Sequence, residues 1–145
     1  MAHLEHSIHV DRPPSEVWRV MIDVERWAEW TATVRSIERN SGSGFAVGSV
    51  YRISQPSLLP ALWHVTRIDD GRAFDWETRP MPGARVVGSH ALEADATGTR
   101  VVLSVRSVGP LAFLLAPVLV PMSRRNLPIE AEGLKRRCEA LARSA

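Results

Sequence analysis

The sequence has almost no cysteine, no long apolar run, and no nucleotide-binding or nucleophile motif. Cys138 is the single cysteine among 145 residues, which excludes an internal disulfide and a Cys-x-x-Cys zinc or redox motif. The most apolar stretch, residues 111–122, is too short to span a bilayer and is interrupted by Pro117 and Pro121. Neither a glycine-rich phosphate loop nor a nucleophile elbow is present. These absences argue against a disulfide scaffold, a membrane-spanning protein and a nucleotide enzyme.

Lysine is also scarce, because 17 of the 18 basic residues are arginines, and the formal net charge is only +2. Residues 1–106 carry 12 basic and 13 acidic side chains, whereas residues 107–145 carry 6 and 3. This mild asymmetry lacks the clustered basic face that nucleic-acid binding needs. The first ten residues are polar and do not form a secretory signal. We therefore expect one cytoplasmic domain over residues 1–145, with no nucleic-acid partner.

Local patterns predict one strand and two short helices near the N-terminus. Residues 6–10 alternate between polar and apolar side chains, as a half-buried strand does. The Pro-Pro-Ser-Glu stretch at residues 13–16 suits the first turn of a helix, where proline needs no N–H partner and an acid favours the dipole. Residues 23–30 form a second short helix with two tryptophans three positions apart, and therefore on one face.

The segment from residue 34 to residue 106 changes to about six strands separated by turns. Asp70-Gly71 lies between two strand-like segments and is typical of a hairpin, since both residues tolerate the positive φ of a type I′ turn. A second turn contains Asp95 and Gly98. Together with the first strand, this gives about seven antiparallel strands.

The last third of the chain changes to a helical period. Its apolar residues recur at spacings of four and three, at Leu127, Ala131, Leu134, Cys138 and Leu141. Residues 110–128 are expected to be helical in pieces, broken or kinked near their prolines. The predicted fold class is α+β, with a curved antiparallel sheet wrapped around a long C-terminal helix and two short helices after the first strand. A strongly curved sheet leaves room for a cavity beneath that helix.

Several short segments carry a resemblance to a known family. They are Ile8-x-Val10, Pro13-Pro14-Ser15-Glu16-Val17-Trp18, Asp23, Trp27-x-x-Trp30, Val47-Gly48, Tyr51-Arg52, Trp76, His90-x-Leu92-Glu93, Gly98-Thr99-Arg100-Val101 and Leu134-Lys135. In these segments the chain resembles polyketide cyclase/dehydrase and lipid-transport proteins of the START and birch-pollen-allergen (SRPBCC) superfamily. The resemblance implies a helix-grip fold and a small hydrophobic ligand of the lipid, isoprenoid or aromatic polyketide class. It supplies no universal catalytic motif and implies no cofactor.

Strand pairing predicts which side chains face the long helix. A two-residue turn at Asp70-Gly71 pairs Arg67 with Phe74 and Val65 with Trp76, and paired residues share a face. The face with more aromatic side chains is assigned to the concave side. The residues expected there are Trp63, Val65, Arg67, Phe74, Trp76, Thr78, Val86, Gly88, His90, Leu92, Val101, Leu103 and Val105.

Nine residues are candidates for contact with a ligand. They are Tyr51, Trp63, Trp76, Thr78, His90, Leu92, Leu103, Leu114 and Met122. Trp63 and Trp76 form either a stiff wall for a flat apolar ligand or part of an ordinary core. His90 is the candidate general acid or base, since an unperturbed imidazole titrates at about 6.5, and the alternative is a buried histidine with one hydrogen bond. Arg67 and Thr78 are polar anchors, unless Arg67 is a solvated side chain at the rim.

Residues 111–122 allow two interpretations. As the start of a helix that covers the cavity, their leucines and Phe113 form a lid or portal wall. As an exposed patch, they mark a homodimer contact or a transient contact with a membrane surface, where Arg124 and Arg125 meet anionic headgroups. The spacing of the histidines fits no zinc site, so no metal is expected.

Three functions are compatible with these patterns. The first is the binding of a small hydrophobic ligand between the sheet and the C-terminal helix. The second is a polyketide cyclase or dehydratase in which the same cavity folds the substrate and His90 or an ordered water moves a proton. The third is a protein-interaction domain whose groove receives a partner segment.

Overall fold

A computed structural model describes residues 2–144, so Met1 and Ala145, which the expected domain includes, lie outside the described part. Seven strands and four helical segments follow one another along the chain. Their order is β1 (His3–Val10), α1 (Pro14–Ile22), η1 (Val24–Glu29), β2 (Ser36–Ser41), β3 (Val50–Ser54), β4 (Ala61–Asp69), β5 (Ala73–Met81), β6 (Ala84–Ala94), β7 (Thr99–Val108), η2 (Ala112–Leu115) and α2 (Ala116–Ser144). The two η segments are short 3-10 helices.

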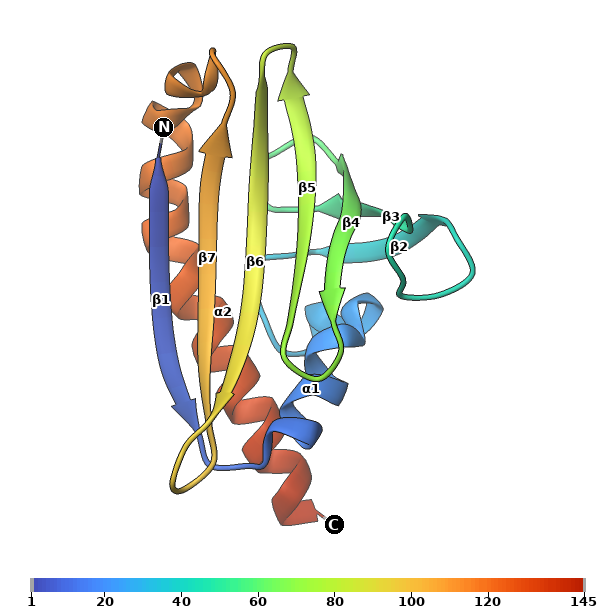
Figure 1. Ribbon diagram of the computed structural model, residues 1–145, viewed down its shortest axis with the longest axis vertical. Coiled ribbons are helices and arrows are strands. Elements are labelled where there is room, and N and C mark those ends of the chain that lie inside the picture. Colours follow the sequence, from blue (N-terminus) through green and yellow to red (C-terminus); the bar gives the residue numbers. More distant parts are fainter. Residues whose placement is uncertain (1, 145) are drawn as a thin grey trace.

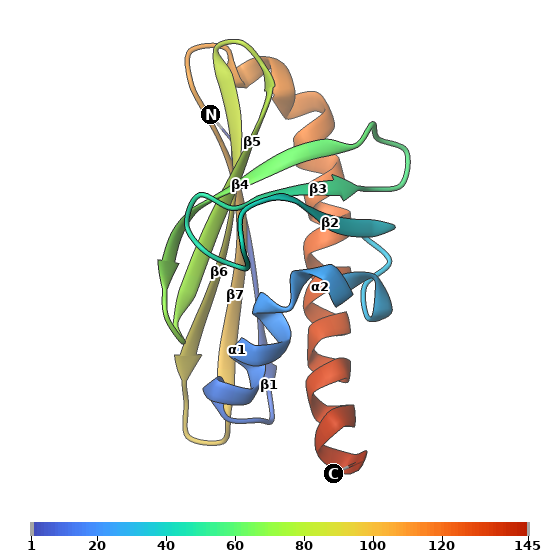
Figure 2. The same ribbon diagram turned by 90° about the vertical axis from the view of Figure 1, so that its right-hand side faces the viewer.

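The strands form one antiparallel sheet in the order β1-β7-β6-β5-β4-β3-β2. The sheet curves, and α2 runs along its concave side (Figures 1 and 2). The expected α+β class, with its curved sheet, long C-terminal helix and two short helices after the first strand, is confirmed. Because β1 and β2 lie at opposite edges of the sheet, α1 and η1 must carry the chain from one edge to the other.

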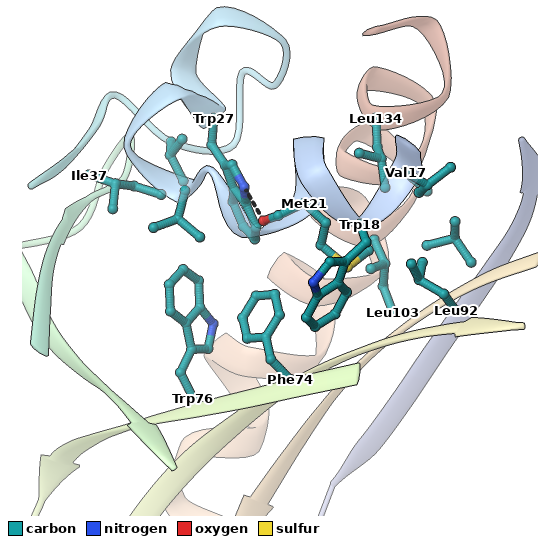
Figure 3. Packing of buried hydrophobic residues seen from close by; sticks show 14 of the residues in the cluster. Val17, Trp18, Met21, Trp27, Ile37, Phe74, Trp76, Leu92, Leu103 and Leu134 are labelled. Carbon is teal, nitrogen blue, oxygen red and sulfur yellow. Dashed lines mark hydrogen bonds between the residues drawn. The ribbon is translucent and has the colours of Figure 1, made fainter. Parts of the chain in front are cut away.

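The α1 and η1 segments fill the space between the sheet and the C-terminal half of α2 (Figure 2). Helix α1 begins with Pro14, as predicted, and buries Val17, Trp18 and Met21. In η1 the indole of Trp27 is buried, and its Nε1 donates a hydrogen bond of 3.0 Å to the Met21 carbonyl (Figure 3). These large side chains make a solid core at one end of the molecule. Neither α1 nor η1 fills the space between the sheet and the N-terminal half of α2.

The β4–β5 hairpin has a longer turn than the one expected. Asp69 pairs with Ala73, so three residues rather than two make the turn. The backbone N–H of Arg72 closes the turn by donating to the Asp69 carbonyl at 2.9 Å. Gly71 adopts φ +77°, the left-handed region that the Asp-Gly pattern predicts. The turn is therefore in the predicted place, with one additional residue.

A β-bulge between Val65 and Arg67 compensates for the longer turn. Beyond the bulge Val65 pairs with Trp76, as predicted. Between the bulge and the turn Arg67 pairs with Asp75 instead of Phe74, and its Nη1 lies 3.5 Å from Asp75 Oδ2. The prediction that Arg67 faces the cavity is therefore wrong. The longer turn shifts the pairing by one residue, and the bulge shifts it back, so only the residues beyond the bulge have the predicted partners.

Helix α2 is a single helix of 29 residues that contains Pro121 and Pro128. The expectation of broken helical pieces over residues 110–128 holds only for η2, which joins α2 directly. An internal proline costs about 3 kcal/mol, and the burial of Leu119 and Leu127 on the same segment offsets that cost. Leu127, Ala131, Leu134 and Cys138 are buried as predicted, whereas Leu141 is 47% exposed. No helix among the described residues is long and apolar enough to cross a membrane.

Candidate functional site

A cavity of about 540 Å³ lies between the sheet and the N-terminal half of α2. Its floor comes from the concave faces of β3 to β7, and its roof comes from η2 and α2. The floor residues include Ile53, Trp63, Trp76, Thr78, Val86, Gly88, His90, Leu103 and Val105. The roof residues are Leu115, Val118, Leu119, Met122, Ser123, Asn126, Leu127 and Glu130. Leu59 of the β3–β4 connection and Val118 of α2 are exposed and also line the cavity, so the cavity reaches the surface beside them.

Two tryptophans form a continuous aromatic wall. The rings of Trp63 and Trp76 lie with their centroids 5.9 Å apart, and Trp27 lies 5.3 Å beyond Trp76. Gly88 makes room for this arrangement, because a Cβ built on it would lie 3.1 Å from Trp76 Nε1. Each ring is held on at least one side by another ring, so the wall is rigid. A flat apolar molecule would find a preformed surface there.

His90 lies at the inner end of the cavity in an aromatic surround. Its imidazole stacks on Phe74, with centroids 4.2 Å apart and planes 8° apart. The edges of Trp27 and Trp76 close two further sides, at 5.4 Å and 5.8 Å. The residue is only 6% exposed. Its ring is therefore held in one orientation by packing.

Glu130 of α2 is the one acidic side chain that reaches His90 among the described residues. Its Oε1 lies 3.5 Å from His90 Nε2, and its side chain is 15% exposed. This geometry favours the tautomer with the proton on Nε2, which leaves Nδ1 as an acceptor. The sequence pattern does not predict this partner, because Glu130 adjoins the apolar stripe of α2 without belonging to it. Its position three residues after the buried Leu127, at the edge of that stripe, is the signal that could have indicated an inward side chain.

Two buried polar atoms of the cavity residues have no hydrogen-bond partner in the described part of the chain. They are Nε1 of Trp63 and Nδ1 of His90. An unsatisfied buried donor or acceptor costs about 1–3 kcal/mol, so such atoms are uncommon in folded proteins. One of the two is a donor and the other is an acceptor in the favoured tautomer. Both atoms have almost no accessible surface, so they lie behind the cavity wall.

Most of the predicted ligand-contact residues line this cavity. Trp63, Trp76, Thr78, His90, Leu103 and Met122 do so. Three others do not, since Tyr51 and Leu92 are buried in the core and Leu114 is 52% exposed outside the cavity. In the case of Leu114 the neighbouring Leu115 takes the lining position. Strand parity alone cannot distinguish a cavity wall from the packed core beside it.

A second hollow of about 710 Å³ lies between α1 and the C-terminal part of α2. It is larger, but three of its four arginines pair with acids, Arg12 with Glu16 at 2.5 Å, Arg26 with Asp23 at 3.4 Å and Arg137 with Glu29 at 2.6 Å. Burial raises the pKa of its Cys138 thiol to about 12, which makes that group inert at neutral pH. This hollow offers ion pairs and a protonated thiol, whereas the first cavity offers apolar walls.

The chain is similar to known proteins in sequence and in structure. Residues 1–139 match the family described as polyketide cyclase / dehydrase and lipid transport. No curated protein matches the chain significantly.

Among solved structures, the Zhui aromatase/cyclase from a Streptomyces species has a TM-score of 0.75 at 18% identity, covering 95% of this chain and 93% of that one. TTHA0849 from Thermus thermophilus has a TM-score of 0.74 at 20% identity, covering 97% and 99%. Ara h 8.0201 has a TM-score of 0.69 at 16% identity, covering 96% and 98%. These likenesses show the fold.

Proposed function

The chain belongs to the polyketide cyclase / dehydrase and lipid transport family, and from that premise we propose that it binds a small hydrophobic ligand in the cavity between the sheet and α2. The observation that carries this proposal is the rigid Trp63–Trp76 wall along an apolar cavity. A volume of about 540 Å³ suits a molecule of lipid, isoprenoid or aromatic polyketide size. The function is carriage or sequestration of that molecule.

Polar groups in the lining refine the expected ligand. Thr78 and Asn126 line the cavity with polar groups. A plain hydrocarbon would offer these groups no hydrogen bond, whereas an oxygenated molecule could form hydrogen bonds with them. We therefore expect oxygenated aromatic or isoprenoid compounds to bind more tightly than hydrocarbons of the same size.

Two measurements test the proposal. Native mass spectrometry after gentle purification, with extraction of bound molecules, detects a ligand that is carried through purification. Displacement of the fluorescent probe N-phenyl-1-naphthylamine then ranks a fatty acid, an isoprenoid alcohol and a hydroxylated anthraquinone. We expect the oxygenated ring compound to displace the probe at the lowest concentration. Unliganded protein together with no probe binding across this panel would contradict the proposal.

A matched pair of variants connects the binding signal with this cavity. Gly88→Leu places a side chain on the cavity floor and should weaken probe binding about tenfold, which is about 1.4 kcal/mol. Ala91→Leu adds the same side chain on the same strand, at the opposite parity and outside the cavity lining, and should leave binding unchanged. Met122→Trp provides a second obstruction from the roof, in case Gly88→Leu displaces Trp76 and loses stability.

The His90–Glu130 pair supports a second function, an enzyme that moves a proton within the cavity. His90 would accept a proton, directly or through an ordered water, from a ligand carbon next to a carbonyl, and Glu130 would stabilise the resulting imidazolium. The carbanion would then attack a second carbonyl of the same chain and close a ring, and the imidazolium would return its proton to the alkoxide that forms. This is the chemistry of an aldol cyclisation, to which the cavity contributes by holding the chain folded.

Product analysis distinguishes an enzyme from a carrier. Incubation with a poly-β-ketone analogue, followed by mass spectrometry, should show a cyclised product that forms faster than in buffer. His90→Phe should lower that rate by about 100-fold or more while the protein still binds the probe. Equal rates for the wild type and His90→Phe would eliminate the role of His90 and leave the binding function in place.

A further inference from the structure

Exposed apolar side chains gather around the opening of the cavity. On one side lie Leu58 and Leu59 of the β3–β4 connection, which are 39% and 89% exposed. On the other side lie Phe113 and Val118, which are each 61% exposed, together with Leu114 at 52%. Leu58, Leu59 and Val118 also line the cavity, so both groups lie where it reaches the surface. We call these five residues, with Arg124 and Arg125, the mouth face. Apolar side chains concentrated in this way mark a contact surface.

The charges around the mouth face have one sign. Residues 96–129 contain no aspartate or glutamate, and they include the exposed Arg124 and Arg125, which follow Met122 in α2. The β3–β4 connection, residues 55–60, carries no charge at all. The surface is therefore apolar with a basic border.

The nearest carboxylate of the β5–β6 hairpin does not counter this border. Glu77 is 8% exposed, and it pairs with two arginines, at 3.0 Å from Arg85 and 3.5 Å from Arg79. The turn acids Asp70 and Asp95 belong to the β4–β5 and β6–β7 connections. Both connections lie toward the other end of the molecule from the β5–β6 turn and the start of α2 (Figure 1). The turn acids therefore lie away from the mouth face.

We propose that the mouth face is a docking surface for an anionic phospholipid bilayer. Phe113, Val118 and Leu59 would enter the interface between headgroups and acyl chains, and Arg124 and Arg125 would contact lipid phosphates. Apolar side chains next to basic ones are the pattern of proteins that lie on membranes without crossing them. The cavity would then open toward the lipid, so that a hydrophobic ligand could pass between them without crossing water.

A second copy of the chain suits this surface less well. A two-fold symmetric dimer through the mouth face would bury the same basic border from both copies, and no acid of residues 96–129 could pair with it. Phosphate groups supply the negative charge that the protein lacks there. Docking also goes beyond the proposed function, because vesicle binding requires no ligand in the cavity.

Flotation with vesicles tests the proposal on the full chain. We expect the protein to float with vesicles of phosphatidylcholine containing about 30% phosphatidylglycerol in about 0.1 M salt, and to bind pure phosphatidylcholine far less. Arg124→Ala together with Arg125→Ala should lower partitioning about 30-fold, since each basic side chain near an anionic surface contributes about fivefold. Phe113→Ser together with Val118→Ser should lower binding through the apolar contact.

A control pair removes the same charge elsewhere. Arg72→Ala together with Arg136→Ala changes exposed arginines of the β4–β5 turn and of a later turn of α2, outside the mouth face. That protein should float within about twofold of the wild type if the site rather than the net charge matters. Equal loss with both arginine pairs would overturn the proposal in favour of non-specific attraction.

Two other results would also overturn it. One is the absence of flotation with anionic vesicles for a protein that still binds N-phenyl-1-naphthylamine, which would leave the ligand-binding proposal intact. The other is a concentration-dependent dimer in sedimentation velocity that Val118→Ser abolishes while the vesicles stay unbound, which would assign the face to a second copy. The melting temperature of each variant is measured as well, and a value equal to that of the wild type shows that the variant is folded.

Discussion

The rings of Phe74 and His90 occupy directly paired positions of β5 and β6 and lie face to face, 4.2 Å apart at their centroids. The stack therefore follows from strand register, and it aligns His90 Nε2 with Glu130 on the opposite helix. Phe74 is fully buried. The packing of the His90 ring on Phe74 thus determines how its Nε2 is directed toward Glu130.

Substitution of His90 should separate packing from polarity. His90→Phe keeps a ring on Phe74 and removes the unsatisfied Nδ1, so we expect the free energy of unfolding to change by less than about 1 kcal/mol. His90→Ala loses the stack and leaves a void, so we expect a loss of about 2–4 kcal/mol. Urea unfolding monitored by circular dichroism measures both. Equal losses would show that the stack contributes little.

Substitution of Gly133 should destabilise the protein although alanine is the better helix former. An alanine Cβ there would overlap the backbone oxygen of Trp30. The gain in helix propensity is about 1 kcal/mol, and backbone cannot easily give way, so we expect Gly133→Ala to lower the free energy of unfolding by about 1–3 kcal/mol. Gly44→Ala is the control, because nothing lies within 4 Å of its Cβ. A stability gain in Gly133→Ala would contradict the close approach of α2 and Trp30.

Low pH should remove the contribution of the Asp95 carboxylate to the stability of the fold. The backbone N–H of Thr97 and then His9 hold the pKa of this carboxyl below its ordinary value, with Thr97 N at 3.0 Å and His9 Nδ1 at 2.8 Å. A lowered native pKa stabilises the fold above the unfolded value of about 3.9, and this contribution is lost as the pH falls through the native value. Asp95→Asn should therefore lower the melting temperature at pH 7 and have little effect near about pH 2. The same difference at both pH values would exclude a charge effect.

The thiol of Cys138 should be unreactive in the native state. Its pKa of about 12 leaves a thiolate fraction of about 10⁻⁴ at pH 8. An exposed cysteine in the unfolded chain, with a pKa of about 8.5, reacts readily. Labelling with a disulfide reagent should thus be slow without denaturant and complete in urea, as absorbance measures. Prompt labelling of the native protein would mean that α2 opens at this turn.

The sequence contains enough to predict the architecture because its period changes clearly. Apolar and polar residues alternate over the middle of the chain, which identifies strands. From Leu127 to Cys138 the apolar residues recur every three or four positions, which identifies a helix without any tertiary information. Pro121 and Pro128 predict a break or a kink, and the break does not occur, because local propensity does not include the packing that holds α2 together.

The candidate site is less predictable, for reasons visible in single residues. Strand parity assigns Arg67 inward because a bulge changes parity without any sequence mark, yet it places Trp63 and Trp76 correctly because the bulge cancels the longer turn. Glu130 cannot be assigned to His90 in advance, because the two belong to elements whose relative rotation is set only when helix and sheet pack. Periodicity describes each element, whereas the cavity arises between elements.

The position of β1 also determines the order in which the fold can assemble. Its only strand neighbour is β7, and the two meet through pairs such as His3 with Arg106, which are about a hundred positions apart. During synthesis β1 is made before β7, so it has no sheet partner until β7 has left the ribosome. Strands β2 to β7 instead pair with their neighbours in the sequence. Of the seven strands described, β1 is therefore the one that stays unpaired longest during synthesis.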